Sequence, residues 1–169
     1  DHGHHGNAIL SRHPILMSEN LDISDHRFEQ RGLLHAVADI NGVEAHLICV
    51  HFGLFAGSRV RQTTALVERV RSVVPADAPL VIAGDFNDWN HKLDSKICNT
   101  LNAVESANAK NGRIHTFPSH MPWWQLDRIY ARGFEFERTQ ALTGREWAQR
   151  SDHVPLMAEL ARRVAIPEV

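Results

Sequence analysis

This sequence of 169 residues has few cysteines, little charge imbalance and no long apolar run. Two cysteines cannot build the disulfide framework of a small secreted domain. The net charge of −2 lacks the basic excess that is typical of nucleic-acid-binding proteins. No apolar run approaches the roughly 20 residues that a membrane-spanning helix requires. The composition therefore indicates one domain over residues 1–169, without a transmembrane segment, and we expect it in the cytoplasm.

The hydrophobic pattern predicts several strands and one long helix. The helix begins with Ser58 as a cap and is ended by Pro75, and weaker helical spacing covers residues 93–104. Asn41-Gly42 predicts a tight antiparallel hairpin, and residues 18–31 have the composition of a loop. Strands are expected over residues 8–10, 33–40, 44–50, 80–83, 126–131, 134–142 and 154–160. The mixture of hairpins and strand–helix–strand units predicts an α+β layered sandwich.

The most informative segment is Gly84-Asp85-Phe86-Asn87, which directly follows an apolar strand. Alternate residues of a strand point to the same side, so Asp85 and Asn87 are expected together at a sheet rim. Hydrolysis of a phosphate ester requires one group that orients water and another that holds an oxyanion. A simple turn stabilised by an aspartate explains the same four residues equally well.

Other strand ends carry polar side chains of the same kind. His51 closes the second hairpin strand, and Asp127 begins a later one. Asp152 and His153 directly precede the last strand. Each residue alone is more often structural, but together with Asp85 they form a credible acid–base and metal site if the strand ends converge.

Five segments occur in the order seen in the endonuclease/exonuclease/phosphatase superfamily. The segments are Gly6–Arg12, Val50-His51, Gly84–Asn87, Leu126–Ile129 and Ser151–His153. The chain resembles that superfamily, and most closely its bacterial metal-dependent hydrolase branch. The resemblance implies a four-layer α/β/β/α sandwich with the site at the top of two sheets. It also implies a phosphodiesterase or related phosphoesterase that uses Mg²⁺ or Mn²⁺.

The resemblance assigns roles to the rim residues. Asp85 would orient or deprotonate the attacking water, and Asn87 would hold a phosphate oxygen. His153 would bind the phosphate or act as general base, with Asp127 as its carboxylate partner. His51 would stabilise the transition state or assist the leaving group.

Further residues are assigned to the metal and the substrate. Asp152 would be a metal-side or water-orienting ligand. Asn7, in the first segment, is a candidate substrate-binding residue. Trp123 and Trp124 are two more, because adjacent tryptophans cannot easily both face inward. The substrate is a nucleic acid, a phospholipid or a small phosphate ester, and the sequence leaves these open.

One expected feature of the family is absent. Its chief metal ligand is a glutamate on an early strand, which would lie upstream of Asp1. The chain thus resembles the C-terminal two-thirds of the domain and would lack the N-terminal strands of one sheet. The missing segment, or a second copy, would then be a partner. Two alternatives remain: a non-catalytic fragment that binds or supports another molecule, and a zinc hydrolase, although no clustered ligand spacing favours zinc.

Overall fold

A computed structural model of the chain describes residues 6–109 and 112–163, which form two β-sheets and four helices. The strands are β1 (Ile15–Asp22), β2 (Gly32–Asp39), β3 (Glu44–His51), β4 (Leu80–Asp85), β5 (Val104–Glu105), β6 (Asp127–Arg132), β7 (Phe134–Ala141) and β8 (Leu156–Arg162). The helices are α1 (Ala56–Val73), α2 (Asp94–Leu101), α3 (Ser106–Ala109) and α4 (Arg145–Ala148).

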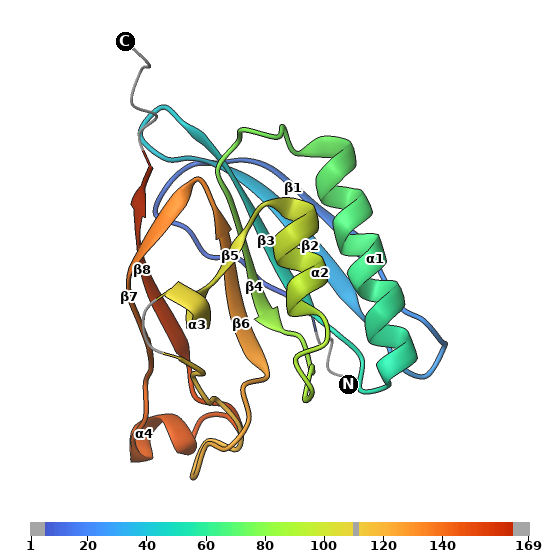
Figure 1. Cartoon of the computed structure of the whole chain (residues 1–169), viewed down its shortest axis with the longest axis vertical. Helices are drawn as coiled ribbons and strands as arrows, with labels where there is room; N and C mark the ends of the chain where they lie inside the picture. Colours follow the sequence, from blue (N-terminus) through green and yellow to red (C-terminus); the bar gives the residue numbers. More distant parts are fainter. Residues whose placement is uncertain (1–5, 110–111, 164–169) are drawn as a thin grey trace.

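Six strands make the larger sheet, in the order β1-β2-β3-β4-β6-β5 (Figure 1). All neighbours in it are antiparallel except β3 and β4, which α1 connects as a parallel strand–helix–strand unit. The second sheet is the antiparallel pair β7-β8. This combination of hairpins with one crossover confirms the predicted mixed α/β class.

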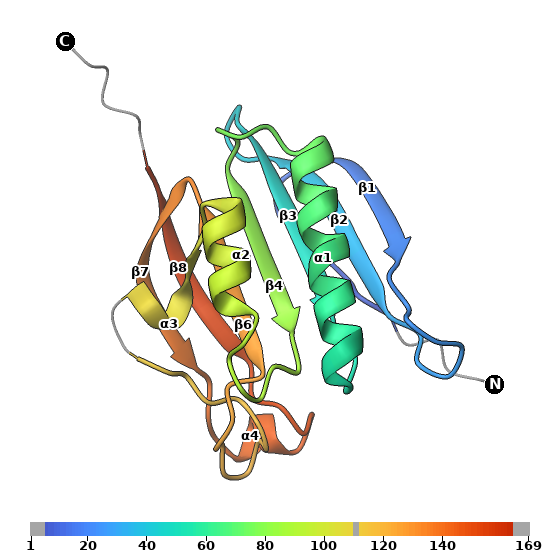
Figure 2. The same ribbon diagram turned by 45° about the vertical axis from the view of Figure 1, so that its right-hand side comes forward.

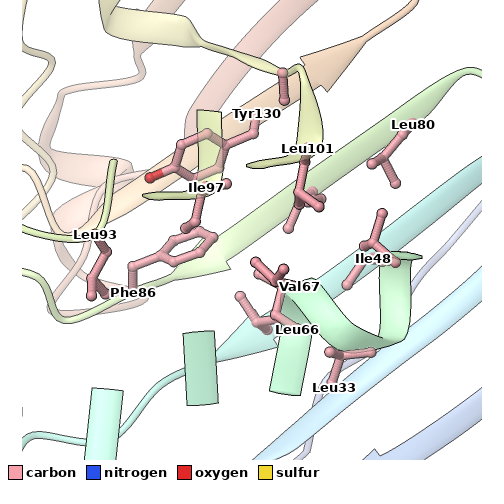
Figure 3. Close-up of a cluster of buried hydrophobic side chains, with 14 of the residues drawn as sticks. Leu33, Ile48, Leu66, Val67, Leu80, Phe86, Leu93, Ile97, Leu101 and Tyr130 are labelled. Atoms are coloured by element: carbon pink, nitrogen blue, oxygen red, sulfur yellow. The ribbon is translucent and has the colours of Figure 1, made fainter. Parts of the chain in front are cut away.

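The main core lies between the large sheet and the helices α1 and α2, which cover the same face of it (Figure 2). Leu66 from α1 and Ile97 from α2 are fully buried there. They pack in one cluster with strand residues such as Ile48 and Tyr130 (Figure 3). The helical spacing of Leu66, Val67 and Val70 therefore identified the buried face in the C-terminal half of α1. Val60 and Val73, which share that spacing, are exposed.

The hairpin between β2 and β3 forms as the Asn41-Gly42 signal predicts. Both residues have positive φ, 55° and 83°, as a two-residue hairpin turn requires. Ile40 and Val43 exchange backbone hydrogen bonds across the turn. The turn fixes the register of the pair, which brings His51 to the end of β3.

The opposite face of the large sheet is apolar but only partly covered. Leu34, Leu47 and Val81 point away from α1 and are half-buried. Ile15 and Leu16 on the edge strand β1 are exposed. Open apolar surface of this kind is what the prediction of an incomplete sandwich describes, and that prediction remains a proposal.

Two local predictions were wrong. Residues 8–10 are not a strand; the strand is β1 instead, and its second half, residues 18–22, falls in the stretch that was expected to be a loop. It pairs along β2, and this long-range pairing outweighs the mostly polar composition of residues 18–22. Ser58 does not cap α1, because the helix starts at Ala56 and the Ser58 hydroxyl donates to Asp25 (2.6 Å).

Candidate active site

Three of the predicted residues form one row across the large sheet. His51 is the register partner of Asp85 in the parallel pair β3-β4. Asp85 is in turn the partner of Asp127 in the antiparallel pair β4-β6. Directly paired residues share a face of the sheet, so the three side chains lie side by side at the rim.

The segment after β4 is shaped by close backbone contact. At Gly84 a side-chain carbon would lie 1.9 Å from the Val50 carbonyl oxygen, so only glycine fits. Asn87 adopts a left-handed conformation with φ 48°. Its backbone N–H donates to Asp85 Oδ1 (2.9 Å). The predicted turn is therefore present and it orients the Asp85 carboxylate, while the functional interpretation of the tetrapeptide stays a prediction.

The Asn87 side chain is buried, with 4% of its surface exposed. Its Nδ2 donates to the Phe52 carbonyl (2.9 Å) and to Asp85 Oδ2 (3.2 Å). Both amide hydrogens are used in this way, which leaves the acceptor Oδ1 for a ligand. In this arrangement Asn87 is better suited to a cation or a water than to a phosphate oxygen.

His153 is held by a carboxylate. Its Nδ1 lies 2.6 Å from Asp127 Oδ2, although the two residues are 26 positions apart. This hydrogen bond raises the pKa of His153, and burial opposes the rise. With Nδ1 engaged, Nε2 is the nitrogen that remains for a substrate.

The loop that carries His153 is fixed by a second loop. Val154 N–H donates to the Thr116 carbonyl (2.8 Å), and Ser119 N–H donates to the Asp152 carbonyl (2.7 Å). These backbone bonds place the Asp152–His153 segment next to β6, which the sequence alone did not indicate.

Asp85 and His51 also influence each other. The distance between His51 Nε2 and Asp85 Oδ2 is 3.5 Å. Burial, reinforced by the neighbouring Asp127, raises the pKa of Asp85. Burial lowers the pKa of His51, while Asp85 opposes that shift. A carboxylate with a raised pKa is the better proton acceptor, as a general base requires.

All six predicted rim residues line one cavity of about 510 Å³. Leu54, Trp89 and Phe117 form much of its apolar wall. The polar residues in the lining are His51, Asp85, Asn87, Asp127, Ser151, Asp152 and His153. The loop position of Trp89, two residues after Asn87, allowed a pocket-lining role, although core packing was the preferred interpretation; no sequence signal pointed to Phe117.

The other three candidates do not line the cavity. Asn7 donates its side-chain amide to the Gly32 and Cys49 carbonyls, at 2.7 and 3.1 Å, and so ties its segment to β2 and β3. Trp123 and Trp124 are both exposed, as their adjacency suggested. A role for these three in substrate binding remains a prediction.

A buried network supports the loop behind Asn87. Arg128 is fully buried and donates to the Asp88 carbonyl (3.0 Å). It also contacts His91 Nδ1 (2.8 Å) and forms an ion pair with Asp94. Tyr130 donates its hydroxyl to the same Asp94 carboxylate. These contacts hold residues 88–94, and with them Trp89, against β6.

Comparison with known proteins gives the family. A sequence profile described as "Endonuclease/Exonuclease/phosphatase family" matches residues 1–153. The chain belongs to this family. It is also 40% identical over 161 residues to the uncharacterized protein YbhP of Escherichia coli K12. That match covers 94% of this chain and 63% of the relative, so the chain spans less than two-thirds of the curated relative's length.

Solved structures show the same fold at low identity. A functionally unknown conserved protein of Enterococcus faecalis V583 matches with a TM-score of 0.75 and 22% identity, over 89% of this chain and 67% of the other. A mannosyl-6-phosphatase of Bacteroides thetaiotaomicron gives 0.70 and 19%, over 88% and 67%. TDP2 of D. rerio, solved with a single-strand DNA product, gives 0.69 and 17%, over 87% and 68%. The chain thus has the fold of a family that hydrolyses phosphate esters.

The donor atoms of the candidate site can be compared with the ligands that a divalent cation prefers. Asp85, Asp127, Asp152 and Asn87 offer the carboxylate and amide oxygens that hard cations prefer. Within residues 6–109 and 112–163, however, no three histidine, cysteine or acidic side chains are grouped closely enough to hold a metal ion. The described residues therefore do not by themselves complete a metal site.

Proposed function

We propose that the protein containing this chain is a phosphoesterase in which Asp85 activates the attacking water. The observation that supports it best is the row of His51, Asp85 and Asp127, with His153 bonded to Asp127, around one cavity. A base with a raised pKa and a histidine held by a carboxylate are the groups that hydrolysis requires.

The chemical step follows from their positions. Asp85 accepts a proton from water, the water oxygen bonds to phosphorus, and the bond to the leaving oxygen breaks. In-line displacement places the leaving group opposite the water. His51 Nε2 lies 3.5 Å from Asp85 Oδ2, and with Asp85 acting on the water we assign His51 to stabilising the charge on the phosphoryl oxygens. His153 binds a phosphoryl oxygen through Nε2 while Asp127 fixes its orientation.

Mg²⁺ or Mn²⁺ remains our proposal for the cofactor, because the donors are oxygen-rich. Asp152 and Asn87 Oδ1 would be ligands of the cation, and a carboxylate from outside residues 1–169 would complete its coordination. A bound cation would neutralise charge on the phosphate. Among the described residues no helix is long and apolar enough to cross a bilayer. A cytoplasmic location is part of the proposal.

Hydrolysis of bis-p-nitrophenyl phosphate by the whole protein tests this function. The rate should depend on added Mg²⁺ or Mn²⁺ and disappear with EDTA. Asp85→Asn should lower kcat by at least about 100-fold with little change in KM, since it removes the base and keeps the shape. Asp77→Asn, an exposed aspartate in the turn before β4, is the matched control and should retain the wild-type rate.

Two outcomes would contradict the proposal. Equal rates for wild type and Asp85→Asn would remove Asp85 from the mechanism. A folded whole protein that hydrolyses neither diesters nor monoesters with any divalent cation would favour the alternative of a non-catalytic binding protein.

A further inference from the structure

The hydrogen bond to Asp127 does not by itself fix the imidazole of His153. It joins Nδ1 to Asp127 Oδ2 over 2.6 Å. A single hydrogen bond holds that nitrogen, but the ring can still pivot about the line between the two atoms, because the terminal torsion of a histidine is broad. Such a pivot would swing Nε2, the nitrogen assigned to a phosphoryl oxygen, out of its place. A second contact is therefore required to define the orientation of the ring.

The Phe117 ring supplies a second contact. Its centroid lies 4.9 Å from the centroid of the His153 imidazole, and the two ring planes are inclined by 47°. This separation falls within the range in which flat rings attract each other. A ring packed beside the imidazole blocks its rotation in that direction, so Phe117 and Asp127 together define one orientation of His153.

Phe117 is itself fixed in place. Its N–H donates to the Trp124 carbonyl (3.2 Å), and its carbonyl accepts from the Trp124 N–H (2.9 Å), as in a short antiparallel bridge. Its ring packs against those of Trp89 and Trp124, each with a centroid 6.1 Å away. The two tryptophan rings contact each other at 5.4 Å, so the three rings support one another.

The residue before Phe117 bonds to both sides of the catalytic pair. The Thr116 carbonyl accepts from the N–H of Val154, the residue after His153 (2.8 Å). The buried Thr116 hydroxyl accepts from the Asp127 N–H (3.3 Å). One short segment therefore holds the backbone of the pair and also places a ring against the imidazole.

We propose that Phe117 is a positioning residue, which acts on the reaction by holding the His153 imidazole so that Nε2 faces the phosphoryl group. This inference rests on the proposed function. Two simpler roles compete with it: direct contact with the substrate, since Phe117 lines the cavity, and packing that only stabilises the fold. Phe117 approaches His153 more closely than it approaches either tryptophan, which favours the positioning role.

Steady-state hydrolysis of bis-p-nitrophenyl phosphate by the whole protein separates these roles. Phe117→Leu removes the flat ring and keeps an apolar side chain. Its kcat should fall at least about tenfold and its KM should change much less, because the imidazole is misplaced in the transition state. Phe117→Tyr restores the ring and should retain the wild-type kcat. Phe136→Leu, at a buried phenylalanine of β7, is the matched control for loss of a ring and should also retain it.

A double variant shows whether Phe117 acts through His153. In a His153→Ala background the imidazole is gone, so adding Phe117→Leu should change kcat by less than about twofold. A further loss of about tenfold in that background would mean that Phe117 acts on the fold or the substrate directly, and the inference would be wrong. A raised KM with the wild-type kcat in Phe117→Leu alone would also overturn it, because that result assigns Phe117 to substrate contact.

Proton NMR of the whole protein tests the positioning without a reaction. The proton between His153 Nδ1 and the Asp127 carboxylate should resonate far downfield, and its loss in His153→Ala assigns it. The signal should persist in Phe117→Tyr and broaden or disappear in Phe117→Leu, where the ring is free to pivot. An unchanged signal in Phe117→Leu would contradict the inference. A wild-type protein that shows this pattern but hydrolyses no phosphate ester would overturn the proposed function and leave the positioning of His153 in place.

Discussion

A buried histidine pair under α1 makes folding stability sensitive to pH. His35 on β2 is fully buried and its Nε2 lies 3.0 Å from Nδ1 of His46 on β3. Arg69 on α1 donates to His35 Nδ1 from Nε at 3.3 Å and also binds Glu19 on β1. Arginine is only a donor, so Nδ1 must be an acceptor and the His35 proton lies on Nε2, directed at His46. A second proton would turn Nδ1 into a donor that faces Arg69.

The magnitude follows from the pKa of His35. Burial, with Arg69 and His46 adding to it and Glu19 opposing, lowers that pKa to about 4. The unfolded chain has a histidine pKa of about 6.5, so it binds a proton first as the pH falls. The contribution of neutral His35 to folding stability is fully present above pH 6.5 and is lost as the pH falls towards 4. Between pH 7.5 and pH 5 these values give a loss of about 2 kcal/mol from this residue.

Urea unfolding at a series of pH values measures this loss. In His35→Gln the amide can accept from Arg69 and donate to His46 but does not titrate in this range. The free energy of unfolding of the variant should therefore fall by about 2 kcal/mol less than that of wild type between pH 7.5 and pH 5. His120→Gln, at an exposed position, is the control for loss of a histidine. Identical pH slopes for His35→Gln and wild type would refute the argument.

Two further predictions concern the strand ends that carry the candidate catalytic residues. Gly84→Ala should destabilise the fold by at least about 3 kcal/mol in urea unfolding, because the new carbon meets the Val50 carbonyl oxygen at 1.9 Å. Gly42→Ala, also at positive φ but with nothing within 4 Å, should cost only about 1 kcal/mol, and similar losses in the two variants would show that the contact is unimportant. Asp127→Asn should lower kcat/KM by about 100-fold to 10,000-fold while circular dichroism stays unchanged, since His153 loses the partner that orients it. A wild-type rate would mean that this pair does not serve the reaction.

Much of the fold could be predicted from local pattern. The apolar spacing between Ser58 and Pro75 identified α1, and Asn41-Gly42 identified the hairpin. These signals are local, because a helix face and a tight turn depend on neighbouring residues. The edge strand β1 could not be recognised, since residues 18–22 are mostly polar and are held in the strand by hydrogen bonds to the distant β2.

The candidate site, like the fold, could be predicted only in part. The residue types at the strand ends were readable from the sequence, and the resemblance to the family gave them roles. The distances between these side chains could not be predicted, because the pairing of β3, β4 and β6 decides which of them become neighbours. The packing of Trp89 against Phe117 could not be predicted for the same reason, since loops carry these residues and the fold brings the loops together.

The sequence by itself determined the class of fold, the family and the polar groups available at the strand ends. Only the tertiary structure decided that the Asn87 amide is used to orient Asp85, and that His153 meets Asp127 across 26 positions. The physical reason is that sequence pattern fixes local backbone geometry, whereas hydrogen bonds between distant segments depend on sheet register and loop packing.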